Sequence, residues 1–486
     1  MNILQKIETL SQVIPSNTAI TSIRYESAGT FATDEKTFTD LPAFVRVALL
    51  VTPSAQSKIN VEVWLPENWN GVFIARGNGG MAGAIPYHTL AEGIRSGYAV
   101  AQTDMGTANG RTGGIGNPEV WKDFGWRATY FMSVIGRQLV CAFYETNQFK
   151  SYFYGTSTGG QQALAMAQRF PEYYDGIIAG VPANNRTHLH TYFLWNHIHL
   201  RTPAGECLFT NKEIEDITDT AVAFYQQCGD GETGDTFITA PKATPEIIEA
   251  FLSFLSQRFP HFSHPQLCAL RSIYTGPVDP VTHRRIYNGM PMGSEKYDCG
   301  IRNCQAPEAP HFYPFLWAFG SNYNGRDFDF NNDMQMIDDC LAEDLNANDI
   351  NLDAFFARGG KLFLYSGTAD PCVPFPDAVG YVQRLARRYD NLSDSCRYFL
   401  IPGHDHGANI FRYGSAMLNG NIELSDNISV IRKWCEDGLA PDCFDFLPTQ
   451  HSKGYRRLFA YSTSPDSSAD TPACSDHYLM RKAKNQ

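Results

Sequence analysis

The fold is decided by residues 150–170, which read KSYFYGTSTGGQQALAMAQRF. The first residues of this stretch are typical of a buried strand, and its last ten are typical of a helix. Between them, Gly155, Ser157 and Gly159 form a G-x-S-x-G pattern. A serine at a sharp turn between a strand and a helix is the arrangement of a nucleophile elbow. The alternative is a glycine-rich turn whose serine caps the helix.

Strand and helix patterns alternate on both sides of this stretch. Residues 43–75 contain apolar runs separated by turn-forming residues, which predict consecutive strands. A middle block of mixed helices and irregular segments follows the serine motif, until KLFLYSG at 361–367 resumes the alternation. A chain of 486 residues also exceeds the size at which one core stops growing. We expect an α/β fold, with an α/β-hydrolase core at 1–200 and 346–486 and a large inserted lid domain at 201–345.

Composition excludes several classes of partner. A net charge of -12 argues against binding to phosphate backbones or anionic lipid, so we expect no nucleic-acid and no membrane partner. The N-terminus has no apolar run of signal-peptide length, which predicts an intracellular protein as written, or a secreted one if a signal was removed. Twelve cysteines and the sequons at Asn185, Asn391 and Asn427 would favour secretion and disulfides. Because no CxxC pair occurs, we expect no metal held by thiolates.

Two further groups occur where a serine hydrolase needs them. Asp370 follows the apolar run 361–367, and His404 and His406 follow the run 397–403. An α/β hydrolase has its acid and then its histidine after later strands, in the order Ser, Asp, His. Taken singly, the aspartate is equally a turn residue and each histidine a surface residue. Their joint occurrence predicts a catalytic triad, in which either histidine could be the base.

An oxyanion hole needs two backbone N–H donors, one usually from the residue after the nucleophile and one from an earlier glycine-rich loop. Thr158 and Gly79 or Gly80 fit these positions. The alternative for the Gly-rich segment is a plain loop. A phosphate-binding loop is disfavoured because no Lys-Ser or Lys-Thr pair follows.

The chain resembles the tannase and feruloyl esterase family, which also includes mono(hydroxyethyl) terephthalate hydrolases. The matching stretches include LPAFVRV, EVWLPENWNG, RGNGGMAG, GYAVAQTDMG, FGWRA, YGTSTGGQQAL, FPEYYDGIIAGVPA, IYTGPVDP, GMPMGSE and YSGTADPCVP. The resemblance covers about residues 40 to 445. It implies an α/β-hydrolase core whose lid supplies much of the acyl pocket, and hydrolysis of esters of aromatic acids such as gallate, ferulate or terephthalate. It also selects His406 as the base.

The chain departs from the family pattern at two positions. Family members usually have a disulfide between cysteines that directly precede the serine and follow the histidine. Here these positions are Thr156 and Gly407. Because both cysteines are absent together, the resemblance implies a protein that does without this disulfide, in keeping with a compartment where disulfides do not persist.

The family's lid also carries a calcium loop, and residues 228–238 look like a shortened version of it. The resemblance implies a structural calcium ion bound by Asp230, Glu232, Asp235 and Ile238, the last through its carbonyl. Acidic glycine-rich loops are otherwise mostly solvated turns. No cofactor is expected for catalysis.

The leading functional prediction is a serine carboxylic-ester hydrolase that acts on esters of feruloyl-like or galloyl-like acids through an acyl-enzyme on Ser157. Its partner would be a small-molecule aromatic ester. One alternative is an intracellular biosynthetic thioesterase or acyltransferase with a polyketide-like aromatic acyl group. A minor alternative is a non-catalytic binding protein on a hydrolase scaffold.

Overall fold

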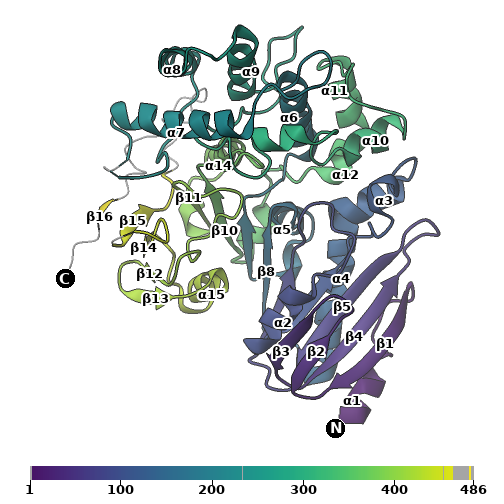
Figure 1. Ribbon diagram of the computed structural model, residues 1–486. Helices are drawn as coiled ribbons and strands as arrows, with labels where there is room; N and C mark the ends of the chain where they lie inside the picture. Colours follow the sequence, from purple (N-terminus) through teal and green to yellow (C-terminus); the bar gives the residue numbers. More distant parts are fainter. Residues whose placement is uncertain (1–2, 232–233, 453, 463–480, 483–486) are drawn as a thin grey trace. The chain divides into compact units, whose positions relative to one another are not determined.

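The structure is a computed structural model that describes residues 3–231, 234–452, 454–462 and 481–482 (Figure 1). The chain divides into two compact units. Unit 1 comprises Met1–Ala179, Leu316–Ser321 and Glu343–Leu362, and unit 2 comprises Gly180–Phe315, Asn322–Ala342 and Phe363–Gln486. None of the helices in the described ranges is long and apolar enough to cross a membrane.

A nine-stranded mixed sheet has the order β1-β4-β5-β7-β6-β8-β9-β10-β11. Its strands are β1 (Thr18–Glu26), β4 (Phe44–Val51), β5 (Ile59–Pro66), β6 (Val72–Arg76), β7 (Ala99–Thr103), β8 (Lys150–Thr156), β9 (Gly176–Gly180), β10 (Lys361–Gly367) and β11 (Cys396–Ile401). The pairs β1–β4, β4–β5 and β5–β7 are antiparallel, whereas β6 pairs in parallel with β7 and β8. The boundary between the units crosses β9 and β10. Every residue of β7 is buried, the polar Gln102 and Thr103 at its end included.

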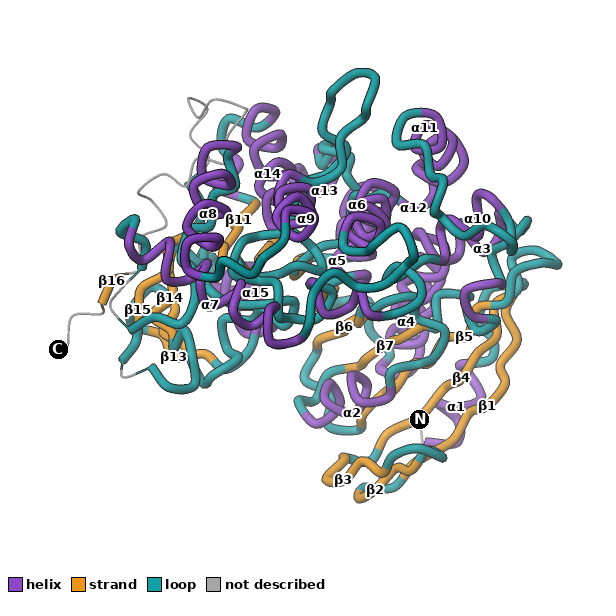
Figure 2. Tube along the Cα trace, turned by 45° about the horizontal axis from the view of Figure 1, so that its top comes forward, coloured by secondary structure: helices purple, strands orange, loops and turns teal. Residues whose placement is uncertain are grey.

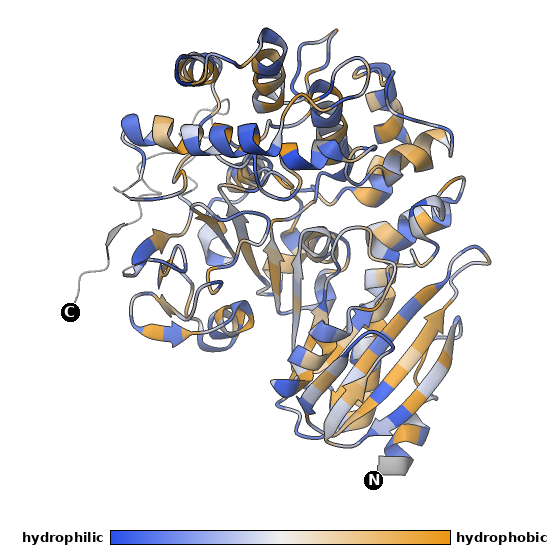
Figure 3. Ribbon diagram, viewed as in Figure 1, coloured by the Kyte–Doolittle hydropathy of each residue, from blue (hydrophilic) through white to orange (hydrophobic). Residues whose placement is uncertain are grey.

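Unit 1 adds helices and a hairpin to its strands. The helices are α1 (Ile3–Leu10), α2 (Tyr87–Arg95), α3 (Pro118–Lys122), α4 (Ala128–Tyr144), α5 (Thr158–Arg169), α12 (Glu343–Leu345) and α13 (Asp353–Ala357), and the hairpin is β2 (Gly29–Ala32) with β3 (Thr37–Leu41). Helix α4 packs on β5, β6 and β7. A Cβ atom on Gly136 would lie 2.6 Å from the ring of Phe73, so a glycine is needed for this close contact. Figure 3 shows that β4 and β5 are mostly hydrophobic.

Unit 2 holds most of the remaining helices and a small sheet. The helices are α6 (Arg186–His199), α7 (Asn211–Gln227), α8 (Pro245–Arg258), α9 (His264–Thr275), α11 (Asn332–Ile337), α14 (Phe375–Arg388) and α15 (Asn427–Asp437), while α10 (Tyr313–Phe319) crosses the unit boundary. The small sheet comprises β13 (Ile422–Leu424), β12 (Ala416–Leu418), β14 (Cys443–Phe446), β15 (Arg456–Phe459) and β16 (Arg481–Lys482). Helix α8 packs on α7 and α9, and α6 packs on α9 (Figure 2).

Helices α6 to α9 share one hydrophobic core with the segment that follows β10. Ile214, Phe251 and Leu270 of these helices belong to the same buried cluster as Cys372 and Val373. Burial of such side chains contributes roughly 1.5–3 kcal/mol each to stability. The helical part of unit 2 and the loop after β10 therefore form one packed body.

Candidate active site

Ser157 lies at a sharp turn of unit 1, between the end of β8 and the start of α5. Its backbone angles are φ 60° and ψ -119°, which residues with a side chain rarely adopt. Strain of this kind persists only where the surrounding structure imposes it, and it is frequent at functional sites. The turn has the strand-turn-helix setting of a nucleophile elbow.

Glycines allow the turn to form and a neighbouring loop to approach it. A Cβ atom on Gly155 would lie 2.1 Å from the carbonyl oxygen of Gly159, and one on Gly77 would lie 2.5 Å from the Cα atom of Gly159. Real Cβ atoms do not approach other atoms so closely. The backbone N–H of Gly159 donates a hydrogen bond to the Asn78 carbonyl at 2.7 Å. The loop after β6 therefore packs directly against the turn at the serine.

The residues predicted for an oxyanion hole lie where this loop meets α5. Thr158 is the first residue of α5, and its hydroxyl donates a hydrogen bond to the Gly80 carbonyl at 2.6 Å. Gly80 has a φ of 55°, and a Cβ on Gly79 would point into open space. The structure brings these three residues together, and their role as oxyanion donors stays a prediction.

Two buried glutamines at the start of α5 hold these segments in place. Gln162 accepts a hydrogen bond from the backbone N–H of Asn78 and donates one to the Thr129 hydroxyl, each at 2.8 Å. Gln161 donates to the Gly125 carbonyl at 2.7 Å. Both glutamines are fully buried, so loss of either side chain would leave buried partners unsatisfied.

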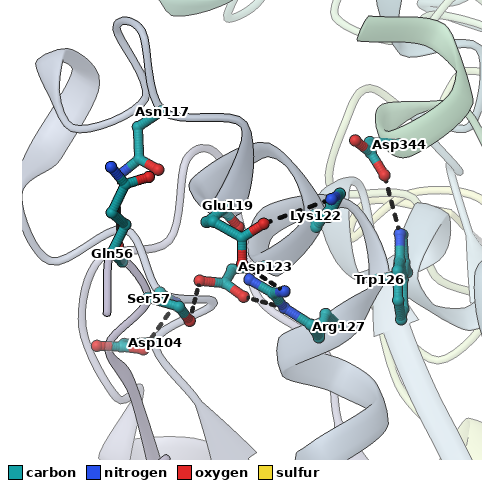
Figure 4. Close-up of polar contacts among 11 residues, drawn as sticks. Gln56, Ser57, Asp104, Asn117, Glu119, Lys122, Asp123, Trp126, Arg127 and Asp344 are labelled. Atoms are coloured by element: carbon teal, nitrogen blue, oxygen red, sulfur yellow. Dashed lines mark hydrogen bonds and ion pairs between the residues drawn. The ribbon is translucent and has the colours of Figure 1, made fainter. Parts of the chain in front are cut away.

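Gly125 belongs to a π-helical turn, η2 (Asp123–Arg127), which charged groups hold in place (Figure 4). The fully buried Asp123 carboxylate accepts hydrogen bonds from the Ser57 hydroxyl at 2.5 Å and from the Arg127 guanidinium at 2.6 Å. Burial raises the pKa of Asp123 even though the hydrogen bonds from Arg127 and Ser57 oppose this effect. These contacts fix the turn that presents the Gly125 carbonyl to α5.

The predicted acid and base meet in unit 2. Asp370 follows β10 and is fully buried, and its Oδ2 lies 2.8 Å from Nδ1 of His406. Its Oδ1 accepts hydrogen bonds from the backbone N–H groups of Cys372 and Val373, at 2.8 and 2.9 Å. The carboxylate is therefore held from both sides. With Nδ1 donating to the carboxylate, Nε2 of the imidazole is left to exchange a proton.

Electrostatics favour the charged form of this histidine. Burial disfavours the imidazolium, but the charge of Asp370 and its hydrogen bond outweigh burial and raise the pKa of His406 to about 9. An aspartate that stabilises an imidazolium in this way is the partner that a general base needs.

The neighbouring His404 has a different environment. It is almost fully buried, and burial lowers its pKa to about 4. Its Nε2 lies 3.2 Å from the Pro448 carbonyl, and its Nδ1 accepts a hydrogen bond from the backbone N–H of Asn409. A neutral, buried histidine with backbone partners is a packing residue, so the carboxylate contact distinguishes His406 from it.

Several cysteines of the described residues are present as free thiols. They are Cys141, Cys228, Cys268, Cys299, Cys340, Cys372, Cys396 and Cys443. The side chain of Cys304, and all of Cys474, lie outside what the structure describes. At Gly407, where the resemblance implied a cysteine in other members, the backbone N–H donates to the Asp405 carboxylate at 2.9 Å.

In the predicted calcium loop, the described carboxylates have protein partners. Asp230 accepts hydrogen bonds from the backbone N–H groups of Thr239 and Ala240, at 2.7 and 2.9 Å. Asp235 forms two hydrogen bonds with the guanidinium of Arg456, at 2.8 and 2.5 Å. A paired guanidinium already supplies the positive charge that a calcium ion would bring.

The other two predicted ligands add no further support for an ion. The Ile238 carbonyl accepts a hydrogen bond from the Thr368 hydroxyl at 3.0 Å. Glu232 lies outside the described residues. The described part of the loop does not fit a calcium site unless Arg456 moves away, and calcium stays a prediction.

Unit 2 also contains a cavity of about 220 Å³. Its wall includes aromatic and sulfur-containing side chains, among them Tyr274, Met290, Met292 and Phe375, together with Arg285. Aromatic rings and thioethers pack well against another ring, so the cavity suits a flat apolar group.

Sequence reasoning did not single out the supporting residues Gln161, Gln162 and Asp123. A signal was present, because two adjacent glutamines directly follow the glycines of the serine motif on an otherwise apolar helix. A polar side chain at a position that the helix must bury indicates a specific buried partner. The partners themselves lie far away in the sequence.

The model of the family described as tannase and feruloyl esterase matches residues 45–307 and 321–476. The chain belongs to the tannase and feruloyl esterase family. One relative is an uncharacterized esterase of Xanthomonas campestris pv. campestris, which is 30% identical over 90% of this chain and 82% of that protein. Another is a probable feruloyl esterase B-1 of Aspergillus flavus, which is 29% identical over 82% of this chain and 77% of that protein. Since members of the family are named as esterases, the chain is a carboxylic ester hydrolase, as predicted.

Solved structures of the tannase and feruloyl esterase family show the same fold. Feruloyl esterase B from Aspergillus oryzae matches with a TM-score of 0.80 and 25% identity, covering 94% of this chain and 95% of that chain. Tannin acyl hydrolase from Aspergillus niger matches with a TM-score of 0.71 and 18% identity, covering 98% and 94%. These matches and the mixed central sheet confirm the predicted α/β-hydrolase fold class.

Proposed function

We propose that this esterase acts through an acyl-enzyme on Ser157, with His406 as general base and Asp370 as the residue that orients the base. The proposal depends above all on the 2.8 Å contact between His406 Nδ1 and Asp370 Oδ2. This contact sets the tautomer in which Nε2 accepts the proton of a nucleophile. The strained turn at the serine supports the proposal, because such a turn presents a hydroxyl outward.

In the proposed first step, Oγ of Ser157 attacks the ester carbonyl carbon while His406 takes the hydroxyl proton. The resulting oxyanion accepts hydrogen bonds from the backbone N–H groups of Thr158 and of Gly79 or Gly80. The intermediate then breaks its bond to the alcohol, which receives the proton from the imidazolium. Water attacks the acyl-enzyme in the same manner and releases the acid.

We propose esters of small aromatic acids as the substrates. Two observations support this class. The relatives carry names such as feruloyl esterase B and tannin acyl hydrolase. The cavity of unit 2 is lined in part by Tyr274, Met292 and Phe375, whose side chains pack well against a ring, although Ser157, Asp370 and His406 do not line it.

Fluorophosphonate labelling tests the nucleophile. We expect one adduct on the full chain, located at Ser157 by peptide mapping, and no adduct on Ser157→Ala. Ser256→Ala, which alters an ordinary serine on α8, is the matched control and should label like the natural chain. An adduct elsewhere, or full ester turnover by Ser157→Ala, would contradict the proposed mechanism.

Different acyl donors and acyl acceptors test the substrate class and the reaction type. We expect methyl ferulate or methyl gallate to be hydrolysed with a higher kcat/KM than methyl acetate, because only the aromatic acyl groups gain contacts in an apolar pocket. Thioesters of the same acids and an added alcohol acceptor separate hydrolysis from acyl transfer. Preferential capture of the acyl group by the alcohol at low concentration would favour an acyltransferase instead.

A further inference from the structure

Three side chains of types that bind metals in proteins lie close together in unit 2, although they come from separate segments. They are Cys299, His311 and Cys372. One donor atom of each, two Sγ atoms and an imidazole nitrogen, lie within 4.8 Å of one another. Both cysteines are buried thiols. We propose that these three side chains bind a thiophilic cation, of which Zn²⁺ is the representative.

The donor set suits such a cation in type and in charge. Zinc is bound in proteins by thiolate and imidazole ligands, with bonds of about 2.3 Å to sulfur and about 2.0–2.1 Å to nitrogen. Tetrahedral ligands at these bond lengths lie roughly 3.5–4 Å apart, so the observed cluster needs only small side-chain movements to close on an ion. Two thiolates also neutralise a divalent charge, which removes much of the cost of burying it.

The backbone holds two of the donors in unusual conformations. Cys299 has a φ of 65° and His311 a φ of 52°, and neither is a glycine. Such conformations are strained and are concentrated at ligand-binding and active sites. A Cβ on Gly300 would lie 2.4 Å from the Glu295 carbonyl oxygen, and the His311 carbonyl accepts a hydrogen bond from Nδ1 of the buried His190 at 2.7 Å. The backbone beside both donors is therefore closely packed or hydrogen-bonded.

A small cavity beside Cys299 has room for a fourth ligand. The cavity measures about 10 Å³, and its lining includes Asn196 and Asn303 but neither His311 nor Cys372. This volume corresponds to about one water molecule. A tetrahedral ion with three protein ligands takes such a water as its fourth ligand.

A disulfide between the two cysteines is the competing interpretation. It requires a sulfur–sulfur distance of about 2.05 Å and uses only two of the three donors. It gives no reason for the imidazole of His311 to converge on the thiols. The absence of a CxxC pair argued against thiolate ligation in the sequence, but this cluster takes its ligands from three segments that only the fold brings together.

Metal binding at this position would fix the loop of the proposed catalytic acid. The backbone N–H of Cys372 donates to Oδ1 of Asp370 at 2.8 Å. The carbonyl of Pro371 accepts a hydrogen bond from the Tyr192 hydroxyl at 2.8 Å. An ion shared by Cys299, His311 and Cys372 would join this loop to two segments of the helical part of unit 2. The inference goes beyond the esterase activity and does not require it.

Cobalt substitution of the full chain tests the site. After reduction and removal of metals with a chelator, we expect one equivalent of Co²⁺ to bind, with a thiolate-to-cobalt charge-transfer band and the visible bands of tetrahedral cobalt. Zn²⁺ should displace the cobalt and raise the Tm. Cys299→Ser and His311→Asn should lose the tetrahedral spectrum, whereas Cys141→Ser, at a partly buried thiol of α4, should keep it.

The asparagine variant guards against misfolding, because asparagine tolerates a positive φ better than most residues. Far-ultraviolet circular dichroism of the same samples reports on folding separately from metal binding. A reduced natural chain without a thiolate–cobalt band would overturn the inference, as would an unchanged spectrum in folded Cys299→Ser. A metal-free chain with a mapped Cys299–Cys372 disulfide would establish the competing interpretation.

Discussion

The buried amide of Gln162 offers a direct test of how the serine turn is supported. Gln162→Leu keeps a similar side-chain volume but removes both hydrogen bonds that the amide makes at 2.8 Å. The N–H of Asn78 is then buried without a partner, which costs about 1–3 kcal/mol. The lost bond to Thr129 adds roughly 1 kcal/mol. We expect the free energy of unfolding to fall by about 2–4 kcal/mol.

Activity should fall as well, because Asn78 directly precedes the proposed oxyanion donors. Loss of one such donor costs roughly 100–1,000-fold in kcat, so displacement of the loop should cost up to about 100-fold. Urea unfolding and the kcat/KM for an aromatic ester measure the two effects. Gln168→Leu is the matched control, since this partly buried glutamine lies at the far end of α5 and donates to the Ala347 carbonyl. If Gln162→Leu resembles the control in both measurements, the supporting role is refuted.

Three further predictions concern the acid–base pair, the loop of unit 2 and the serine turn. The kcat/KM should rise with pH through the pKa of His406, which is about 9, because only the neutral imidazole accepts a proton. In Asp370→Asn the inflection of this pH profile should move to lower pH and kcat should fall. An inflection that does not move would contradict the pairing of His406 with Asp370. Arg456→Ala should destabilise the protein by about 3–5 kcal/mol because it removes the positive charge that neutralises the buried Asp235, and calcium should restore part of the Tm only if the vacated position accepts an ion. Gly155→Ala should abolish labelling of the serine or prevent folding, because its Cβ would overlap the backbone, and an active variant would show that the turn can relax.

The local setting of each proposed catalytic residue could be predicted from the sequence, while its role stays a prediction. Ser157, Asp370 and His406 each follow an apolar run closely, and in an α/β sheet the residues after such runs lie at the edge that carries ligands. The choice between His404 and His406 was not contained in the residues alone. It depends on which ring meets a carboxylate and which is buried among backbone groups, and those contacts are set by tertiary packing.

The acidic loop at residues 228–238 shows what a local pattern leaves undecided. An acidic, glycine-rich segment has the same local pattern whether its charge is neutralised by an ion or by a distant side chain. Here the partner of Asp235 is Arg456, which reaches it from a strand of the small sheet more than two hundred residues later in the chain.

The cluster of Cys299, His311 and Cys372 is the converse case, because the fold brings together residues that no sequence pattern connects. Spacing rules recognise metal sites whose ligands lie close together in sequence, as in CxxC pairs. Ligands contributed singly by three segments have no such signature, so a sequence can argue against a thiolate site that its fold nevertheless assembles. A local motif such as the serine turn therefore predicts the conformation of its own segment, whereas the groups that surround it come from distant parts of the chain.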